Sequence, residues 1–464
     1  MRYISTRGGA PAAGFLDVVL EGLAPDGGLY VPETWPAFSA ADLKAMAVMD
    51  YPTLAAEILA RFAGEEIDRP TLQRMAEEAY ATFSHAAVTP LKQLERGLWL
   101  LELFHGPTLA FKDVAMQLLA RLYDHALGAR GRTATIVVAT SGDTGGAAVE
   151  AFRGRRNVQL IVLYPHGRIS EVQRRFITTA EDDNVRVLAL DGVFDDCQAI
   201  VKAIFQDPAL QGAGLSGVNS INWSRIAAQT VYYFASGLAL GAPARPVSYA
   251  VPTGNFGDAF AGYVASRMGL PIERMIVATN GNDIMSRAVE TGRYERGEVK
   301  ATQSPAMDIQ AASNFERLYY EGVGRDAQET ARAMQGFSQT GSIEIPTQAL
   351  SMIRGLFRGA MVDEAETSRT IAQTLKLTGE LIDPHTAVGV AAARRVGPAD
   401  AATPLVVLST AHPAKFPETV LAASGVEPAV TPQVRALEGK AERIRRLPAE
   451  VEAVKAVVRE AMGI

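Results

Sequence analysis

The residue best suited to covalent chemistry in this chain is a lysine at position 112. Lys112 is one of nine lysines among 464 residues and follows Phe111, just before a predicted helix over 114–123. Apolar surroundings and the positive end of a helix both disfavour an ammonium ion, so such a lysine could be a neutral amine. A neutral amine can attack a carbonyl carbon and form a Schiff base. The alternative is a lysine whose charged end reaches solvent, and this loop alone favours that alternative.

A second loop, 139–148, has the residues of an anion site. Ser141, Asp143 and Thr144 lie where a strand ends and a helix begins, so hydroxyls and backbone N–H groups can bind an anion there. The loop has neither the P-loop lysine nor the G-x-G-x-x-G spacing of nucleotide sites. Its Asp-Thr-Gly triplet also occurs in aspartic proteases, but those enzymes need two such triplets, and a helix follows the one found here.

Two more loops follow predicted strands. In one of them, Gly254 and Gly257 would let backbone N–H groups surround a phosphate at the start of a helix. Asp258 is poorly suited to contact a phosphate dianion, and its simplest role is to cap that helix. The loop 408–416 carries two hydroxyls and a second candidate lysine, Lys415. Four loops that supply a lysine, phosphate cradles and hydroxyls together indicate a pyridoxal phosphate site.

Buried strands must position these loops. From about residue 97, short apolar runs alternate with helical stretches, and most runs are apolar on both faces, as in parallel strands. This alternation predicts an α/β fold with parallel sheets, whose ligands bind at the carboxyl ends of the strands. Residues 1–95 are mostly helical by pattern, and the charged segment 435–462 predicts a solvated helix. The expected strands are 98–104, 135–140, 158–164, 185–190, 247–251, 275–279 and 405–408.

Composition excludes several classes of function. The 45 Lys and Arg against 51 Asp and Glu leave a net charge of −6, whereas nucleic-acid binders usually carry a basic stripe. The single cysteine, Cys197, cannot form an intramolecular disulfide, and it fits a small buried hydrophobe in a reducing, cytoplasmic compartment. The six histidines lack metal-ligand spacing, so no metal is expected. No apolar run is long enough for a membrane span, and no signal peptide is evident.

Six segments, in order, resemble the threonine synthase family, which belongs to the fold type II (tryptophan synthase β-like) class of pyridoxal phosphate enzymes. The resemblance covers nearly the whole chain, and the set is specific although no single loop is. It implies two parallel-sheet α/β lobes and a mostly helical N-terminal domain. The matching segments are Tyr3–Gly8, Asp26–Pro32, His105–Asp113, Ser141–Gly146, Val218–Arg225 and Thr253–Asp258.

This resemblance implies that pyridoxal 5′-phosphate is bound covalently to Lys112 rather than to Lys415. Thr410 matches the hydroxyl residue that faces the pyridine nitrogen, where a hydroxyl does not force that nitrogen to be protonated. The segment that matches the cofactor phosphate loop consists of Gly254, Asn255, Phe256, Gly257 and Asp258.

Two further segments match the substrate-binding parts of the family. Ser141 and Thr144 match the loop that receives the carboxylate and phosphate ends of the substrate. Asn219, Ser220 and Arg225 match the substrate phosphate pocket, and the fork of an arginine suits a phosphate well. Without the family match, a surface ion pair would be the simpler explanation of Arg225.

Asp143 departs from the wider class. Many fold type II relatives have Asn at this position, where it hydrogen-bonds the phenolic oxygen of the cofactor, whereas the bacterial and fungal threonine synthases have Asp. A carboxylate would repel a phenolate, so we expect Asp143 to share a proton with the cofactor or to pair with the imine. The substitution Asp143→Asn should then shift the pH titration of the visible band.

The implied reaction converts O-phospho-L-homoserine and water to L-threonine and phosphate, the last step of threonine synthesis. The freed amine of Lys112 removes the α-proton, and the pyridine ring takes up the electron pair. Loss of a β-proton then expels the γ-phosphate, and water adds at the β-carbon. Closure of the lobes is expected to exclude water until elimination is complete.

Other interpretations stay open. A serine/threonine dehydratase would share the lysine and the glycine loop, but not segment 219–225 or the N-terminal motifs. A phospholyase that forms 2-oxobutyrate needs the same phosphate pocket and is harder to separate. A non-catalytic protein of this fold is disfavoured because Lys112 and all four loops are retained. A nucleotide-binding dehydrogenase has no glycine fingerprint in support.

The expected organisation has three parts. Residues 1–95 form the N-terminal domain, 96–242 the first lobe with the Schiff-base lysine, and 243–464 the second lobe with the phosphate loop and C-terminal helices. Pro243 and Pro246 mark the boundary between the lobes. The implied partner is a small-molecule substrate, with neither nucleic acid nor membrane. The resemblance favours a monomer and leaves a homodimer open.

Overall fold

Two sheets organise the computed structural model, which describes residues 1–210 and 214–464. One sheet has the order β15-β7-β6-β5-β8 and is parallel throughout. The other has the order β13-β10-β9-β14-β4-β3 and is parallel except for the hairpin β3–β4. The strands of the first sheet are β5 (Ala134–Ala139), β6 (Val158–Pro165), β7 (Val185–Asp191), β8 (Leu215–Ser216) and β15 (Arg445–Pro448). Those of the second are β3 (Leu91–Glu95), β4 (Leu98–Glu102), β9 (Val247–Pro252), β10 (Ile272–Thr279), β13 (Phe357–Met361) and β14 (Leu405–Ser409).

Helices cover both faces of the first sheet, which explains why its strands are apolar on both sides. Val137 and Ile161 face α8 and the C-terminal helix α19, while Ile136 and Leu160 join the large core on the opposite face. Cys197 of α8 is fully buried, as expected, in the core that contains Val137 and Ile161. The helices around this sheet are α5 (Lys112–Arg130), α6 (Asp143–Phe152), α7 (Glu171–Thr178), α8 (Phe194–Phe205), α9 (Trp223–Ala239) and α19 (Val451–Met462).

The second sheet is covered in the same way. Ala250 and Val407 face α16, whereas Tyr249 and Val251 face the core that this sheet shares with the first. The helices of this half are α10 (Gly257–Arg267), α11 (Ile284–Thr291), α12 (Phe315–Gly322), α13 (Ala327–Thr340), α14 (Thr347–Leu356), α15 (Glu364–Thr378), α16 (Pro384–Val396) and α17 (Pro417–Ser424). Helix α18 (Pro432–Arg435) instead packs Val434 against a small cluster that includes Phe176 of α7. A small hairpin pairs β11 (Arg293–Glu295) with β12 (Ser342–Glu344), and the short 3₁₀ turns η1 and η2 span Pro305–Met307 and Pro413–Lys415.

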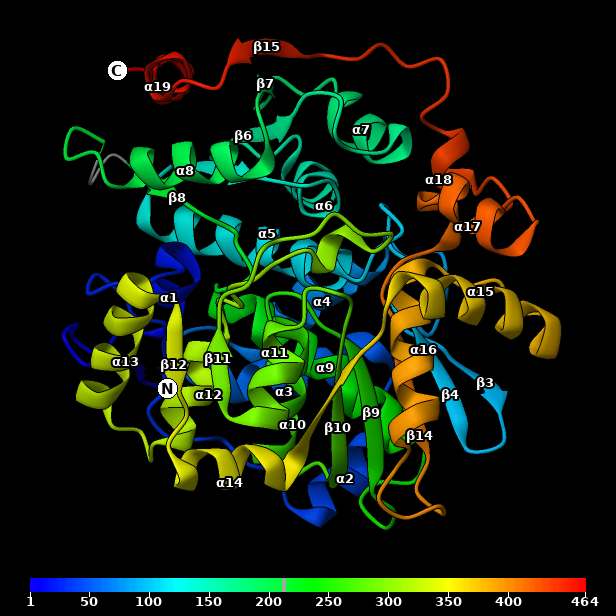
Figure 1. Ribbon diagram of the computed structural model, residues 1–464. Helices are drawn as coiled ribbons and strands as arrows, with labels where there is room; N and C mark the ends of the chain where they lie inside the picture. The colour runs from blue at the N-terminus through cyan, green and yellow to red at the C-terminus, as the bar shows by residue number, and fades with distance from the viewer. Residues whose placement is uncertain (211–213) are drawn as a thin grey trace.

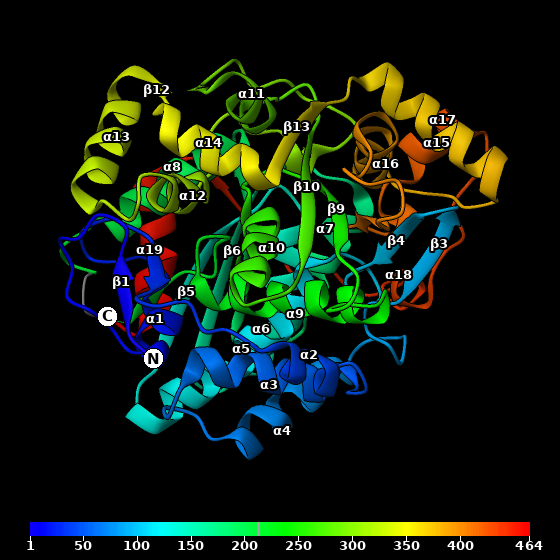
Figure 2. The same ribbon diagram turned by 90° about the horizontal axis from the view of Figure 1, so that it is seen from below.

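The N-terminal region is helical, with a two-stranded sheet of β1 (Tyr3–Ser5) and β2 (Tyr30–Pro32) that the sequence pattern did not predict. Its helices are α1 (Phe15–Glu21), α2 (Ala40–Met46), α3 (Tyr51–Ala63) and α4 (Arg69–Tyr80). Helix α3 packs on α9 and α4 packs on α5 (Figure 2), so this region contributes to the large core. No helix in the described part of the chain is long and apolar enough to cross a membrane.

The sheets do not follow the expected lobe boundaries at 96 and 243. Strand β4 belongs to the second sheet, although it was expected in the first lobe. The C-terminal segment returns to the first sheet: β15 pairs with β7, and α19 lies beside it (Figure 1). The helix expected over 435–462 is present only as α19 (Val451–Met462), and the expectation that it is solvated is wrong. Helix α18 ends at Arg435, and α19 buries Val454, Val457 and Val458 against the first sheet.

Candidate active site

Four loops meet between the two sheets, at the carboxyl ends of β4, β5, β9 and β14. Lys112 begins α5, two residues earlier than the predicted helix start. The preceding loop is joined to the segment after β14, because Phe111 N–H donates to Thr410 O at 2.9 Å and His412 N–H donates to Leu109 O at 3.1 Å. Thr410, predicted to face the cofactor, is therefore held beside the backbone of Lys112. Its side chain is buried.

Asp143 brings two lysines together. It is the first residue of α6, and its Oδ2 lies 3.5 Å from Lys112 Nζ. Its Oδ1 lies 2.7 Å from Lys415 Nζ and accepts a hydrogen bond from Gln173 Nε2 at 2.9 Å. Lys415, which the sequence offered as a rival to Lys112, is thus a neighbour of the same carboxylate. Gln173 was not predicted, since it lies in a different helix, α7.

The charges in this cluster act on the pKa of Lys112. Burial lowers the pKa of Lys112; Asp143 opposes that shift, while the cations of Lys415 and Arg225 add to it. Burial alone would raise the pKa of Asp143, but Lys415 and Lys112 hold it well below the usual range. Asp143 is therefore an ionised carboxylate at neutral pH, and Lys112 is shifted toward the neutral amine that covalent chemistry requires.

The loop after β9 presents free backbone N–H groups. Phe256 adopts a left-handed conformation with φ 62°, which turns the chain sharply before α10. Within residues 1–210 and 214–464, the N–H groups of Gly254, Asn255, Phe256 and Gly257 have no hydrogen-bond acceptor. A Cβ on Gly254 would lie 2.7 Å from Ala306 O, so glycine is required for the loop to lie this close to its neighbour. Free N–H groups at a helix N-terminus fit a phosphate.

Asp258 does not cap α10, the role that the sequence suggested. Its carboxyl accepts hydrogen bonds from the hydroxyls of Tyr232 and Tyr233 on α9, the latter at 3.1 Å. Burial raises the pKa of Asp258 to about 7, although the two tyrosines and Lys112 lower it. The side chain therefore anchors the loop to α9, which leaves the backbone as the part available to a phosphate.

The loop after β5 offers a second set of donors. The hydroxyl of Thr140 accepts hydrogen bonds from the N–H groups of Gly142 and Gly145, both at 2.9 Å, and this fixes the turn. The N–H groups of Ser141, Asp143 and Thr144 find no acceptor among the residues that the structure describes. Ser141 and Thr144 are half-buried, so their hydroxyls and these N–H groups could bind an anion.

Arg225 is a buried cation next to these loops. It lies in the first turn of α9, where Nη1 donates to Val218 O at 3.2 Å and Nε has no partner among the described residues. Burial lowers its pKa to about 10. A buried guanidinium with an unused donor fits an anionic ligand. Asn219 is exposed and Ser220 is half-buried.

A buried asparagine joins the two predicted phosphate sites. Asn314 Nδ2 donates to Ser220 O at 3.2 Å and to Asn255 O at 3.1 Å. Arg317, fully buried, donates to Asn314 Oδ1, to Ile221 O and to Tyr30 O in β2 of the N-terminal region. Neither residue was predicted, because each contributes only through contacts with distant loops. The predicted cofactor and substrate residues thus lie in one connected site.

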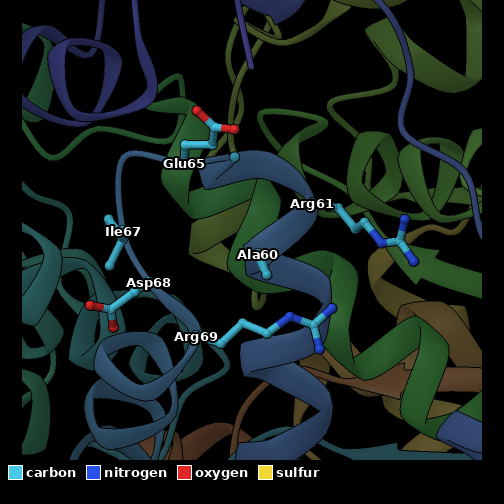
Figure 3. A pocket seen from close by; sticks show the side chains of 7 residues that line it. Ala60, Arg61, Glu65, Ile67, Asp68 and Arg69 are labelled. Atoms are coloured by element: carbon cyan, nitrogen blue, oxygen red, sulfur yellow. The ribbon is translucent and has the colours of Figure 1, made fainter.

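A separate pocket of about 380 Å³ lies where α3 ends and α4 begins, and none of the predicted site residues lines it (Figure 3). Its arginines already have partners, since Arg69 and Arg61 lie 2.6 and 3.8 Å from carboxylate oxygens of Glu57. The geometry around Lys112 is therefore the better candidate for chemistry.

Comparison with known proteins gives three matching family profiles. Residues 2–80 match "Threonine synthase N terminus", residues 82–352 match "Pyridoxal-phosphate dependent enzyme", and residues 386–458 match "Threonine synthase, C-terminal". The threonine synthase of Pseudomonas aeruginosa is 48% identical over 460 residues, which cover 99% of this chain and 98% of that protein.

Solved structures give the same result. The crystal structure of PLP-bound threonine synthase from Brucella melitensis is 52% identical, covers 100% of both chains and superposes with a TM-score of 0.96. Threonine synthase from yeast is 37% identical, with 100% and 99% of the two chains covered and a TM-score of 0.93. The α/β fold with two mainly parallel sheets is therefore confirmed as that of the pyridoxal phosphate enzymes.

Proposed function

Because this chain belongs to the threonine synthase family of pyridoxal-phosphate dependent enzymes, which convert O-phosphohomoserine to threonine, we propose that Lys112 and the loops around it carry out that reaction. The observation that carries the proposal is the position of Lys112. Its side chain is 12% exposed, its pKa is lowered, and its Nζ lies 3.5 Å from Asp143 Oδ2, beside two sets of N–H donors that have no acceptor among the described residues.

The residues present fit the cofactor. Lys112 would hold pyridoxal 5′-phosphate covalently, and the N–H groups of Gly254, Asn255, Phe256 and Gly257 would hold its phosphate, with Asp258 as the anchor of that loop. Thr410 would face the ring nitrogen. When bound, the cofactor supplies an electron sink for the carbanion formed at the α-carbon of the substrate.

The substrate would bind on the other side of Lys112. Ser141 and Thr144 would receive one anionic end through their hydroxyls and the free N–H groups of their turn. Arg225, with Asn219 and Ser220 at the entrance, would bind the phosphate group. Because the same residues would hold phosphate after it leaves, Arg225 would keep the product in the site while water adds.

Proton transfer would be the task of Lys112 Nζ. Burial and the neighbouring cations favour its neutral form, so it can take a proton from the α-carbon of the substrate. Asp143, held ionised, would stabilise the ammonium that results.

We also propose that the chain acts as a monomer in the cytoplasm. The family resemblance supports the monomer. The single buried cysteine supports the compartment, and no helix in the described residues could span a membrane. The three-part organisation stays a proposal, modified by the exchange of β4 and of β15 with α19 between the halves. Light scattering should give a mass near 49.5 kDa for the monomer, and a doubled mass would show a dimer.

Product analysis tests the proposed function. The cofactor-loaded protein is incubated with O-phospho-L-homoserine, and phosphate, threonine and 2-oxobutyrate are assayed together. Equal amounts of phosphate and threonine are expected. Phosphate with 2-oxobutyrate would instead identify a phospholyase that uses the same cofactor and pocket. Absence of phosphate release would overturn the substrate site at Asn219, Ser220 and Arg225.

A further inference from the structure

The second lysine of the site, Lys415, has no task in the reaction proposed above. Its side chain is only 1% exposed, and its Nζ lies 2.7 Å from Asp143 Oδ1. The same nitrogen donates to Thr108 O at 2.8 Å. Lys112 approaches Asp143 less closely, at 3.5 Å. Of the two lysines that share this carboxylate, Lys415 is therefore the closer partner.

The two carboxylate oxygens of Asp143 have different hydrogen-bond partners. Gln173 is oriented by Ser170, whose N–H donates to Gln173 Oε1 at 3.2 Å, so Gln173 Nε2 points at Asp143 Oδ1. Oδ1 thus accepts from both Gln173 and Lys415 and has no room for a proton. Oδ2 is the oxygen on the side of Lys112.

Lys415 is itself held in place. Its carbonyl acceptor, Thr108 O, belongs to a residue whose N–H and hydroxyl both donate to the buried carboxyl of Asp113, at 2.8 and 2.7 Å. The ring of Phe176 lies 5.5 Å from Lys415 Nζ, and the Lys415 N–H donates to His412 O at 3.0 Å. The ammonium group therefore has a fixed position rather than the freedom of a surface lysine.

We propose that Lys415 is a positioning residue that takes up the charge of Asp143 and thereby prevents Lys112 from being held as an ammonium ion. The inference rests on the proposed role of Lys112. The charged groups that act on this cluster are Lys112 from α5, Asp143 from α6, Arg225 from α9 and Lys415 from η2. The carboxyl of Asp113 lies beside Lys415, and the carboxyl of Asp258 in α10 also interacts with Lys112. Without Lys415, Lys112 would be the only lysine paired with Asp143, and that pair would favour a protonated amine.

The test compares four forms of the cofactor-loaded protein: wild type, Lys415→Met, Asp143→Asn and the double variant. The pH midpoint of the visible cofactor band is measured for each. Lys415→Met should raise the midpoint by roughly one pH unit, because Asp143 then acts on Lys112 alone. Asp143→Asn should lower the midpoint by much less in the wild-type background than in the Lys415→Met background. Turnover at neutral pH should fall with Lys415→Met and recover with Lys415→Arg.

Lys92→Met is the matched control, because Lys92 pairs with Glu380 on the surface and should leave the midpoint unchanged. A second readout is the pH dependence of the rate at which cofactor-free protein takes up pyridoxal phosphate, since only the neutral amine attacks the aldehyde. It decides the question if the band does not titrate. If Lys415→Met fails to fold, Lys415→Gln takes its place in both measurements.

Two results would overturn the inference: a Lys415→Met midpoint equal to that of wild type in both measurements, or an Asp143→Asn shift that is the same in both backgrounds. Failure of the proposed function is separate. If Lys112→Ala still forms the covalent visible band, the role of Lys112 is wrong. A normal band that Lys415 does not affect would overturn only the positioning role.

Discussion

Two loops of this chain have the same local structure, but their aspartates have different partners and opposite pKa shifts. Each loop follows a parallel strand and opens a helix, and each places an aspartate in the first helical turn, Asp143 in α6 and Asp258 in α10. Both side chains are buried. The partners differ, because Asp143 contacts two lysines and Asp258 contacts two tyrosine hydroxyls.

The difference in partners becomes a difference in charge. Lysines hold the pKa of Asp143 below its usual range, while burial among neutral groups raises the pKa of Asp258 to about 7. Asp143 can therefore act electrostatically on a reacting nitrogen, whereas Asp258 serves as an anchor. The same glycine-aspartate pattern thus marks a reactive loop in one place and a holding loop in the other, and only the distant partners distinguish them.

The largest effect should come from removing the amine next to Asp143. Lys112→Ala is expected to lower turnover by at least about 1000-fold, because the covalent link and the proton acceptor are lost together. Phosphate release from O-phospho-L-homoserine measures the loss. Lys415→Met serves as the comparison, since it removes a cation from the same carboxylate but keeps the reacting amine. Activity of the Lys112→Ala protein within tenfold of wild type would show that the reacting amine lies elsewhere.

The sequence predicted most of the buried strands of the two sheets well. Apolar runs such as 158–164 and 185–190 match β6 and β7 closely, because buried parallel strands carry a continuous hydrophobic signal. The loop after β9 was noticed because Gly254 and Gly257 would let backbone N–H groups surround a phosphate. By contrast, β15 was missed: Arg445 and Arg446 are exposed on an edge strand, and such charges are as typical of a solvated helix.

Partners from distant loops were the part that the sequence could not supply. Lys415 was noticed as a lysine after a strand, but nothing local shows that it lies 2.7 Å from Asp143. Asn314 carries no motif at all, and it contributes by joining Ser220 O to Asn255 O. The predicted cap role of Asp258 failed for the same reason, since Tyr232 and Tyr233 compete for its carboxyl.

Stability should separate the two aspartates next. Asp143→Asn leaves the ammonium of Lys415 buried without its carboxylate, which we expect to cost about 3–5 kcal/mol of unfolding free energy. Asp258→Asn should cost only about 1 kcal/mol, because the hydroxyls of Tyr232 and Tyr233 can donate to an amide oxygen as well. Urea unfolding of the cofactor-free variants measures both. Equal losses would contradict the difference in charge that we assign to these carboxyls.

The pH dependence of stability gives the same comparison with opposite signs. The pKa of Asp258 is about 7 in the folded protein, against an ordinary value of 3.8. Its contribution to the unfolding free energy is therefore fully present below pH 3.8 and is lost as the pH rises through 7. The lowered pKa of Asp143 has the reverse effect, a contribution present above pH 3.8 and lost on acidification. Asp258→Asn should therefore flatten the fall in unfolding free energy between pH 4 and 7. Asp143→Asn, measured under the same conditions, should still show this decrease in unfolding free energy. If Asp258→Asn also shows the full decrease, the decrease comes from another titrating group.

The smallest effects should separate the ligands of the two loops. A Cβ at Gly254 would lie 2.7 Å from Ala306 O, so Gly254→Ala must displace the loop after β9 and should raise the Kd for pyridoxal phosphate about tenfold or more. Thr144→Val keeps the shape of the side chain but removes its hydroxyl from the loop after β5. It should raise the KM for O-phospho-L-homoserine roughly fivefold, with the Kd for the cofactor unchanged. Which constant each variant changes is more informative than the size of the change. If Thr144→Val raises the Kd for the cofactor, or Gly254→Ala changes only the KM for the substrate, the two loops do not bind cofactor and substrate separately.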